Sequence, residues 1–532
     1  MFRNRTLAWP KIGWMAFIVF ILCTAGCFGG GGGEEKPAGA PAGREGSDSF
    51  HYPMEGRPTL TLMDEFDVGG KPVRKPIDEE YEKRTGIAIE HLGGIPMQDN
   101  RFSLLLASGR LPDIWMNTWL QYPGGPEKAI EQGYILPLND LIDRYAPNFK
   151  RVLKERPDID KMIKTDSGLY YVFPFIRSES DRVYGGPIVR KDWLDELGLP
   201  VPETIGEWYT MLKAFKEKKG AAAPLTLRSL FLGERTAGFA GAFGVMGNFY
   251  VEDGKVKYGY IEPGYKAYLA TMRKWVQEGL LDKDFAVVDL DTVDKKMMSG
   301  ASGSTIGWQF YIEKYNLAAR SHRSSARYVA APYPTLVKGE IPKFGQLDNA
   351  YAGTSSAAIT AGAKNAEAAV RWLDYAYSEE GSMLNTYGIE DVTYTMESGV
   401  PVFTDFVVNN PDGVASDQVL LKYAHQSNFP MIQREFQNEW KFEETSRSKE
   451  IWRKTRHENH LLPPITPTAE EAAELSLLME RIDKYVKDAE LRILLGEDPI
   501  DAYDAMAAHV KAMGIERVLE IKQAAYQRYL NR

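Results

Sequence analysis

Cysteine is almost absent from this chain of 532 residues. Its only two cysteines, Cys23 and Cys27, both lie near the N-terminus, so none is left downstream for a disulfide bond or a thiolate metal site. We therefore expect a hydrophobic core, without covalent cross-links, to hold the body together. Hydrophobic residues make up 44% of the chain and charged residues 26%, as in ordinary globular proteins, so such a core can form.

Excess positive charge is also missing. The chain has 64 lysines and arginines against 73 aspartates and glutamates, which gives a formal net charge of −9. A protein that binds nucleic acid needs a broad basic surface to neutralise phosphate groups, and this balance does not supply one. We therefore expect no nucleic-acid partner.

Long hydrophobic runs are confined to the N-terminus. Residues 1–11 carry positive charges and no acid, and residues 12–24 are almost wholly apolar. This segment is shorter than the roughly 20 residues that cross a bilayer, and it ends in small residues. It therefore predicts a secretory signal rather than a transmembrane helix.

The apolar segment ends in Ala-Gly-Cys, which resembles the lipobox of bacterial lipoproteins. The resemblance implies that residues 1–26 are removed, that Cys27 is lipidated, and that the protein is anchored in the cell membrane on its extracytoplasmic face. Thr24 stands where lipoboxes usually have a large aliphatic residue. A free Cys27 thiol after ordinary signal cleavage is the alternative.

Residues 27–56 predict a flexible tether. They include five consecutive glycines at 29–33 and several prolines, a composition that cannot bury apolar surface. A flexible chain of this length would hold a folded body about 25 to 30 Å from the membrane. A tethered receptor and a tethered enzyme are the two classes of protein that this organisation favours.

Known catalytic signatures are absent from the body. The sequence contains no GxxxxGK[ST] phosphate loop, HExxH helix or GxSxG elbow. His457 and His460 could meet on one helical face, but no third ligand lies at a recognisable spacing, so we predict no metal site and no cofactor. Glycoside hydrolysis stays open, because it needs only two carboxylates across a cleft.

Strands and helices alternate along the body. β-forming residues at 58–66 precede a charged helical pattern at 76–85, which Gly86 ends, and a second strand pattern follows at 87–91. This order recurs further along the chain and predicts an α/β fold with a mostly parallel sheet in two lobes. After residue 469 the pattern changes to helices only.

Aromatic residues are abundant, with 11 tryptophans, 28 tyrosines and 23 phenylalanines, several of them in predicted loops. Aromatic faces stack on the C–H faces of sugar rings, while nearby amide, carboxylate and guanidinium groups bind the hydroxyls. The composition therefore favours a sugar-binding cleft.

Six segments together resemble one known family. They are LLLASGRLPDIW (104–115), ILPLNDLIDRYAPNFK (135–150), SGLYYVFPF (167–175), IVRKDWLDELGLPVPETIGEWYTMLKAFK (188–216), GIEDVTYTMESGVPVFTD (388–405) and MGIERVLEIKQAAYQRY (513–529). They are similar to the family 1 extracellular solute-binding lipoproteins of carbohydrate ABC importers, especially the large branch that includes alginate-oligosaccharide binders. The resemblance covers nearly all of the mature chain.

The resemblance implies a two-lobed periplasmic-binding-protein fold with hinge crossings and a C-terminal helical region. It places residues 57–175 and about 328–405 in lobe 1, and residues 176–327 and about 406–532 in lobe 2. Many relatives follow the KAFK helix with an acidic calcium loop. Here residues 220–224 read GAAAP and lack the oxygen ligands that calcium requires, so no calcium site is expected.

Eight residues are candidate ligand contacts in such a fold: Asn117, Trp119, Phe175, Arg177, Trp308, Gln309, Tyr394 and Trp440. Asn117 and Trp119 follow a predicted strand at its carboxyl end, where ligands sit in open α/β sheets. Trp308 and Gln309 end another predicted strand, where relatives place a cleft tryptophan. Packing in the core is the alternative for each aromatic residue.

The inferred first hinge carries Phe175 and Arg177. Arg177 could bind sugar hydroxyls or a uronic carboxylate, and an interlobe salt bridge is the alternative. We predict a monomeric, membrane-tethered receptor without enzymatic activity that delivers an oligosaccharide to the permease subunits of an ABC transporter. A surface glycoside-active enzyme is the alternative, and a peptide or metal receptor is disfavoured.

Overall fold

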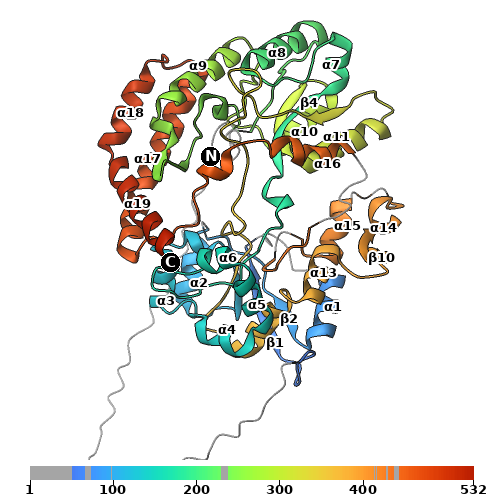
Figure 1. The fold of residues 1–532 in the computed structure, drawn as a ribbon, viewed down its shortest axis with the longest axis vertical. Helices are drawn as coiled ribbons and strands as arrows, with labels where there is room; N and C mark the ends of the chain where they lie inside the picture. Colours follow the sequence, from blue (N-terminus) through green and yellow to red (C-terminus); the bar gives the residue numbers. More distant parts are fainter. Residues whose placement is uncertain are drawn as a thin grey trace, which may run out of the picture. The chain divides into compact units, whose positions relative to one another are not determined.

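The computed structural model describes residues 51–65, 74–97, 99–228, 238–412, 414, 416–426, 429–435 and 443–532 (Figure 1). The predicted signal segment, Cys27, most of the predicted tether and Trp440 lie outside these residues. Within the described ranges, every helix is too short or too polar to span a membrane.

The first lobe is built on a four-stranded sheet with the strand order β2-β1-β3-β9. β1 (Thr59–Asp64) pairs in parallel with β2 (Ala88–His91) and β3 (Ile114–Met116), and β9 (Ala357–Ile359) joins the edge in the antiparallel direction. The β-α-β order predicted at the start of the body is therefore confirmed. The helices of this lobe include α2 (Asn100–Ser108), α3 (Gly125–Glu131), α4 (Asn139–Tyr145), α5 (Pro147–Glu155), α6 (Pro157–Met162), α12 (Ala366–Tyr375) and α13 (Glu379–Tyr387).

Helix α1 (Pro76–Thr85) occupies the range predicted from the sequence. Ile77 and Tyr81, four residues apart, are buried in the first-lobe core, and Gly86 ends the helix in the left-handed conformation. The Tyr81 ring contacts Phe429, which follows α14 (Asp405–Val408) and α15 (Ser416–Tyr423) in the chain. The segment that begins near residue 406 therefore packs on the first lobe, whereas we expected it in lobe 2.

The second lobe is built on a three-stranded antiparallel sheet with the order β7-β4-β8. Its central strand β4 (Gly185–Arg190) is buried throughout and pairs with β7 (Ser304–Trp308) and β8 (Tyr328–Ala330). A mostly parallel sheet was predicted, and residue 328 was placed in lobe 1. Both predictions are wrong for this sheet, which is antiparallel and includes residue 328. The alternation of strands and helices in the sequence does not reveal which buried strands pair.

Further elements complete the second lobe. They are α7 (Lys191–Leu197), α8 (Ile205–Lys219), α9 (Pro263–Gln277), α10 (Leu290–Ser299), α11 (Gln309–Ser321), α16 (Glu443–Trp452) and the hairpin of β5 (Phe249–Glu252) with β6 (Lys255–Tyr258). Trp452 is fully buried, and its indole N–H donates to the Ala331 carbonyl at 3.1 Å. A side chain at Gly186 would collide with the Trp452 ring, so glycine at this position lets α16 pack on β4.

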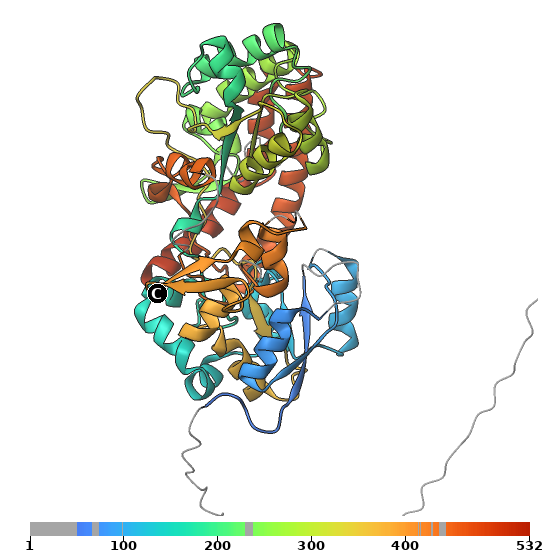
Figure 2. The same ribbon diagram turned by 90° about the vertical axis from the view of Figure 1, so that its right-hand side faces the viewer.

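Three helices end the chain: α17 (Ala469–Leu495), α18 (Ala502–Ala512) and α19 (Ile515–Asn531). Ile482 and Val518 lie in the second-lobe core. At the end of α19, Arg528 and Arg532 both form ion pairs with Asp166 of the first lobe. The C-terminal helices therefore contact both lobes; in Figures 1 and 2 they run beside the second lobe, and the chain ends at the first.

Candidate functional site

Before the C-terminal helices, three of the described segments run between the two lobes. The first crossing is residues 174–184, the second is 345–350, and the third begins at residue 431. The Ile176 amide donates to the Met431 carbonyl at 2.7 Å, and the Arg177 amide donates to the Ala350 carbonyl at 2.9 Å. All three crossings therefore meet at Ile176 and Arg177.

Arg177 forms an ion pair with Asp348 across the first and second crossings. Its Nη2 lies 3.2 Å from Asp348 Oδ2, and both side chains are nearly buried, with exposed fractions of 12% and 13%. The guanidinium lies over the rings of Phe175 and Tyr184, at 5.2 and 5.4 Å from their centroids. The Tyr184 hydroxyl donates to Asp348 Oδ2 at 2.9 Å. Arg177 therefore has a salt bridge, but it joins two crossing segments, whereas the alternative left open by the sequence was a salt bridge between the lobes.

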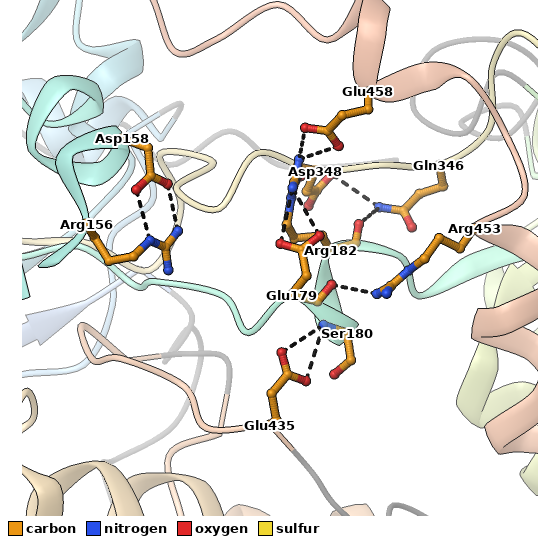
Figure 3. A network of polar contacts seen from close by, with 10 residues as sticks. All are labelled: Arg156, Asp158, Glu179, Ser180, Arg182, Gln346, Asp348, Glu435, Arg453 and Glu458. Atoms are coloured by element: carbon orange, nitrogen blue, oxygen red, sulfur yellow. Dashed lines mark hydrogen bonds and ion pairs between the residues drawn. The ribbon is translucent and has the colours of Figure 1, made fainter.

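Arg182 ties the same crossings together (Figure 3). Its Nε donates to the Asp348 carbonyl at 2.9 Å, and its Nη2 contacts the Glu458 carboxylate at 2.9 Å. Arg453, which follows α16, donates to the Glu179 carbonyl at 2.7 Å. These contacts fix the first crossing relative to the second crossing and to the second lobe.

Trp308 and Gln309 lie where β7 ends and α11 begins. The Trp308 ring is half-buried and stacks on the exposed Phe310 ring, with a centroid separation of 5.8 Å. It also abuts Gly185, where an added Cβ would lie 3.3 Å from Trp308 Cδ1. The backbone N–H of Gln309 donates to the Tyr184 carbonyl at 2.9 Å. Tyr184 and Gly185 thus connect the junction of β7 and α11 to Arg177.

The structure therefore brings four predicted residues into one group. We call it the crossing site: Phe175, Arg177, Tyr184, Trp308, Gln309 and Asp348. Two polar atoms of this site, Arg177 Nε and Gln309 Oε1, are buried and have no hydrogen-bond partner among the described residues. Buried polar atoms are normally paired, so this donor and this acceptor are candidates for contact with a ligand.

Asn117 and Trp119 lie in the first lobe, apart from the crossing site. Trp119 is fully buried among Phe102, Trp115 and Tyr122, and its indole N–H donates to the Trp115 carbonyl at 3.0 Å. Asn117 is also fully buried, and its Oδ1 accepts a hydrogen bond from the next backbone amide at 2.8 Å. These contacts favour the packing alternative for both residues.

Glu65 and Thr118 form a polar pair at the carboxyl end of the first-lobe sheet, and the sequence reasoning missed both. Glu65 follows β1 and Thr118 follows β3, and the Thr118 hydroxyl donates to Glu65 Oε1 at 3.0 Å. Burial raises the pKa of Glu65 above its usual range. The argument that selected Asn117, from the carboxyl end of a strand, applies equally to these residues.

Tyr394 belongs to a different part of the first lobe. It begins β10 (Tyr394–Glu397), which forms a hairpin with β11 (Val400–Phe403), and it lines a hollow of about 710 Å³. Trp440 lies outside the described residues. The structure therefore separates Tyr394 from the crossing site.

The two histidines considered for zinc face different backbone carbonyls. His457 Nδ1 lies 2.6 Å from the Gly345 carbonyl oxygen, and His460 Nδ1 lies 2.9 Å from that of Val251. In the part of the chain that the structure describes, no group of three or more histidine, cysteine, aspartate and glutamate side chains is placed to hold a metal ion. The hydrogen bonds give both imidazoles a structural role.

We expect His457 to make stability depend on pH. Burial lowers its pKa to about 4, whereas an unfolded histidine titrates near 6.5. The unfolded chain therefore takes up this proton first, so the stability gained with neutral His457 is present above pH ~6.5 and is lost as the pH falls toward 4. Between pH 7 and pH 5 the loss should be about 2 kcal/mol.

The measurement is urea unfolding at both pH values for the wild type and for His457→Gln. The variant should lose less stability on acidification than the wild type. His322→Gln, at an exposed position, is the matched control and should leave the pH dependence unchanged. Equal losses in wild type and His457→Gln would contradict the prediction.

The segment after α8 has no calcium loop. Helix α8 ends at Gly220, and the four residues that follow, AAAP, have no side-chain oxygen. A chelator lowers the melting temperature of a protein only if it removes a stabilising bound ion. Because we expect no calcium site, EDTA should leave the melting temperature of this protein unchanged. Calorimetry with EDTA, and then with added calcium, tests this. A calcium-dependent rise of the melting temperature would reveal a site elsewhere.

Comparison with protein families matches residues 65–383 to the family described as "Bacterial extracellular solute-binding protein". One curated relative is the fructooligosaccharide ABC transporter substrate-binding protein FusA of Streptococcus pneumoniae serotype 4. It is 27% identical over 356 residues, which are 63% of this chain and 64% of FusA. The match thus spans less than two thirds of the length of that relative. Lipoprotein LipO of Bacillus subtilis is 24% identical over 75% of this chain and 76% of its own length.

The fold is also that of solved structures. Alginate-binding protein AlgQ2, in a crystal structure without calcium ion, matches with a TM-score of 0.74 and 23% identity over 90% of this chain and 99% of AlgQ2. FusA in complex with kestose matches with a TM-score of 0.71 and 21% identity over 89% of this chain and 99% of that structure. The predicted two-lobed α/β fold is therefore confirmed.

Proposed function

The chain belongs to the family of bacterial extracellular solute-binding proteins, and we propose that it captures an oligosaccharide between its two lobes and delivers it to an ABC transporter. In this role the protein binds and releases the sugar without changing it. Its partners are the permease subunits of the transporter. The fructooligosaccharide relative and the alginate-binding structure support a saccharide as the ligand class.

The observation that carries the proposal is the chemistry of the crossing site. Tyr184 and Gly185 connect the Arg177 guanidinium to the Trp308 indole and the Gln309 side chain, and Arg177 and Gln309 each have a buried polar atom without a partner among the described residues. An aromatic face together with a free donor and a free acceptor suits a sugar ring with its hydroxyl groups. The site lies where the crossings meet, so a ligand here would touch the segments that move when lobes close.

A glycoside-active enzyme fits the site less well. Such an enzyme needs two carboxylates flanking the bond, one of them able to protonate the leaving oxygen. The carboxylate in the crossing site, Asp348, is held by Arg177 and by the Tyr184 hydroxyl. These contacts occupy its oxygens, as befits a structural group.

The test is a binding screen with fructo-, xylo- and manno-oligosaccharides and with oligogalacturonides. A bound sugar at a hundred times its Kd should stabilise the protein by about 2.7 kcal/mol, which thermal unfolding detects. Chromatography of the sugar after long incubation should return it unchanged. Shortened products at an enzyme-like rate would establish the enzyme instead, and no stabilisation by any sugar would reject the proposal.

Lipidation of Cys27 is part of the same proposal, because the receptor must stay near its transporter. LipO, a lipoprotein, supports it. We expect Cys27→Ala to leave an unprocessed precursor or to release the protein, whereas wild-type protein partitions into the detergent phase through its acyl chains. Mass spectrometry of the wild-type N-terminus is the measurement, and an unmodified Cys27 thiol would contradict the prediction.

A further inference from the structure

The hollow around Tyr394 is separate from the crossing site. It has a volume of about 710 Å³, within the range of roughly 300 to 1,000 Å³ that is usual for ligand sites. Its walls come from α13, from the hairpin β10–β11 and from the start of the third crossing, with one arginine from α1. In Figure 1, α13 and β10 lie close together in the first lobe.

Tyrosine and other apolar side chains line part of this hollow. The Tyr387 and Tyr394 rings lie 5.7 Å apart, and Met383, Met396 and Pro401 lie beside them in the lining. Burial, and then the carboxylate of the neighbouring Glu390, raise the pKa of Tyr394, so its hydroxyl keeps its proton at neutral pH. The hollow thus offers ring faces for stacking and a hydroxyl that donates.

Carboxylates outnumber guanidinium groups in the lining. The charged residues are Arg84, Glu379, Glu380, Glu390, Arg434 and Glu435. Both arginines are already engaged, because Arg434 lies 3.3 Å from the Glu379 carboxylate and Arg84 lies 2.8 Å from that of Glu80. Carboxylate oxygens accept hydrogen bonds from hydroxyl groups and repel anions. The hollow therefore suits a neutral polyhydroxylated ligand better than a uronic acid.

Hydrogen bonds of Glu435, and three residues of the first crossing, connect the hollow to the crossing site. The Ser180 amide of the first crossing donates to the Glu435 carboxylate at 3.1 Å (Figure 3). The Tyr387 hydroxyl donates to the Glu435 carbonyl at 2.9 Å. Ser180 follows Arg177 by three residues, which span at most about 10 Å of extended chain. Glu435, which lines the hollow, therefore contacts a residue that lies only three positions from Arg177 of the crossing site.

We propose that the hollow binds the distal end of a long neutral oligosaccharide whose other end occupies the crossing site. This inference rests on the proposed function and adds to it the class and length of the ligand. Short saccharides would fill the crossing site alone. Longer ones would also stack on Tyr394, and their hydroxyl groups would donate hydrogen bonds to the Glu390 carboxylate.

A single introduced cysteine can report occupancy of the hollow. Residues 28–532 contain no cysteine, and Met396 lines the hollow with an exposed fraction of 46%. In the chain from residue 28 onward, the thiol of Met396→Cys is modified with a chromogenic disulfide. The probes are the same fructo-, xylo- and manno-oligosaccharides, each as a ladder of lengths, and an oligogalacturonide ladder. Leu477→Cys, on α17 and 68% exposed, is the matched control.

The long members of a neutral ladder that raises the melting temperature should slow modification of the Met396→Cys thiol by about tenfold or more, because modification requires access to the thiol. The shortest binding members and the Leu477→Cys control should show no slowing. In addition, Glu390→Gln should weaken binding of the long members several-fold and leave that of the short members unchanged.

Three other results would overturn the inference, and they can be told apart. Long neutral sugars that stabilise the protein while the Met396→Cys thiol stays fully reactive would reject the hollow and retain the proposed function. Equal protection by oligogalacturonides would reject the neutral class. If no ladder raises the melting temperature, the proposed function fails, and the inference fails with it.

Discussion

Trp308→Ala should weaken binding of the cognate oligosaccharide by roughly ten- to a hundredfold. A tryptophan face stacked on a sugar ring contributes on the order of 1 to 2 kcal/mol beyond area burial, and each 1.4 kcal/mol is a factor of ten in Kd. Trp308 is the aromatic residue of the crossing site nearest to Gln309, whose Oε1 has no partner among the described residues. Its removal leaves that acceptor without the adjoining ring face.

The same substitution should also reduce the stability of the apo protein. The Trp308 ring packs between two hydrophobic clusters of the second lobe and lies 5.5 Å from the Tyr311 ring. A fully buried tryptophan replaced by alanine costs about 3 to 5 kcal/mol, and the half-buried Trp308 should cost less, about 1 to 3 kcal/mol. Trp308 is therefore expected to support both the fold and the ligand.

Trp275→Ala is the matched control, because Trp275 lies fully buried on α9 in the second-lobe core. It should lower stability more than Trp308→Ala and leave the Kd of the folded fraction unchanged. Urea unfolding and titration calorimetry at a temperature where each variant is folded separate the two effects. An unchanged Kd in Trp308→Ala would assign Trp308 to packing and remove the main aromatic surface from the crossing site.

Local sequence patterns predicted the elements well. The spacing of Ile77 and Tyr81 and the position of Gly86 predicted the exact bounds of α1. Trp308 and Gln309 were expected to end a strand, and β7 does end at Trp308, but Gln309 already starts α11. Such patterns are visible in sequence because they depend on residues a few positions apart.

The pairing of strands that are far apart in the chain could not be predicted from the sequence in the same way. The antiparallel sheet of the second lobe depends on Ile188 facing both Thr305 and Ala330, more than a hundred residues away. Its order cannot be derived from the periodicity of any one strand. For the same reason the expected return to the first lobe near residue 328 was too early: β8 belongs to the second sheet, and Tyr351 is the first aromatic residue after it in the first-lobe core.

The same contrast between local patterns and distant contacts applies to the candidate site. Position at a strand end or a hinge drew attention to Arg177, Trp308 and Gln309, which the fold connects through Tyr184 and Gly185. It could not tell that Trp119 is enclosed by other rings, because burial depends on the packing of distant helices. Tyr184 and Asp348 were missed, since an ordinary tyrosine and aspartate in loops carry no signal until the crossings place them against Arg177.

Asp348→Asn should be among the most destabilising polar substitutions in the chain. It leaves Arg177 as a nearly buried cation without its carboxylate, and it removes the charge that accepts from the Tyr184 hydroxyl. Breaking a buried ion pair by removing one partner costs about 3 to 5 kcal/mol. Because both side chains keep slight exposure, we expect about 2 to 4 kcal/mol by urea unfolding.

Glu217→Gln is the matched control for loss of a carboxylate. Glu217 pairs with Lys213 at 3.8 Å on the surface of α8, and the two side chains are 62% and 44% exposed. Such pairs contribute little, so this variant should change stability by less than about 1 kcal/mol. A comparable loss in both variants would show that Asp348 acts only through general charge effects.

Asp348→Asn should also change which sugars bind. In the wild type the Asp348 carboxylate neutralises Arg177, and this favours neutral ligands at the crossing site. With asparagine at position 348 the guanidinium would be free to pair with a carboxylate of the ligand. Binding of oligogalacturonides should therefore strengthen relative to neutral oligosaccharides, and added salt should weaken this gain. If the preference does not move although stability falls, Arg177 does not contact the ligand, and its ion pair with Asp348 serves only to hold the crossings together.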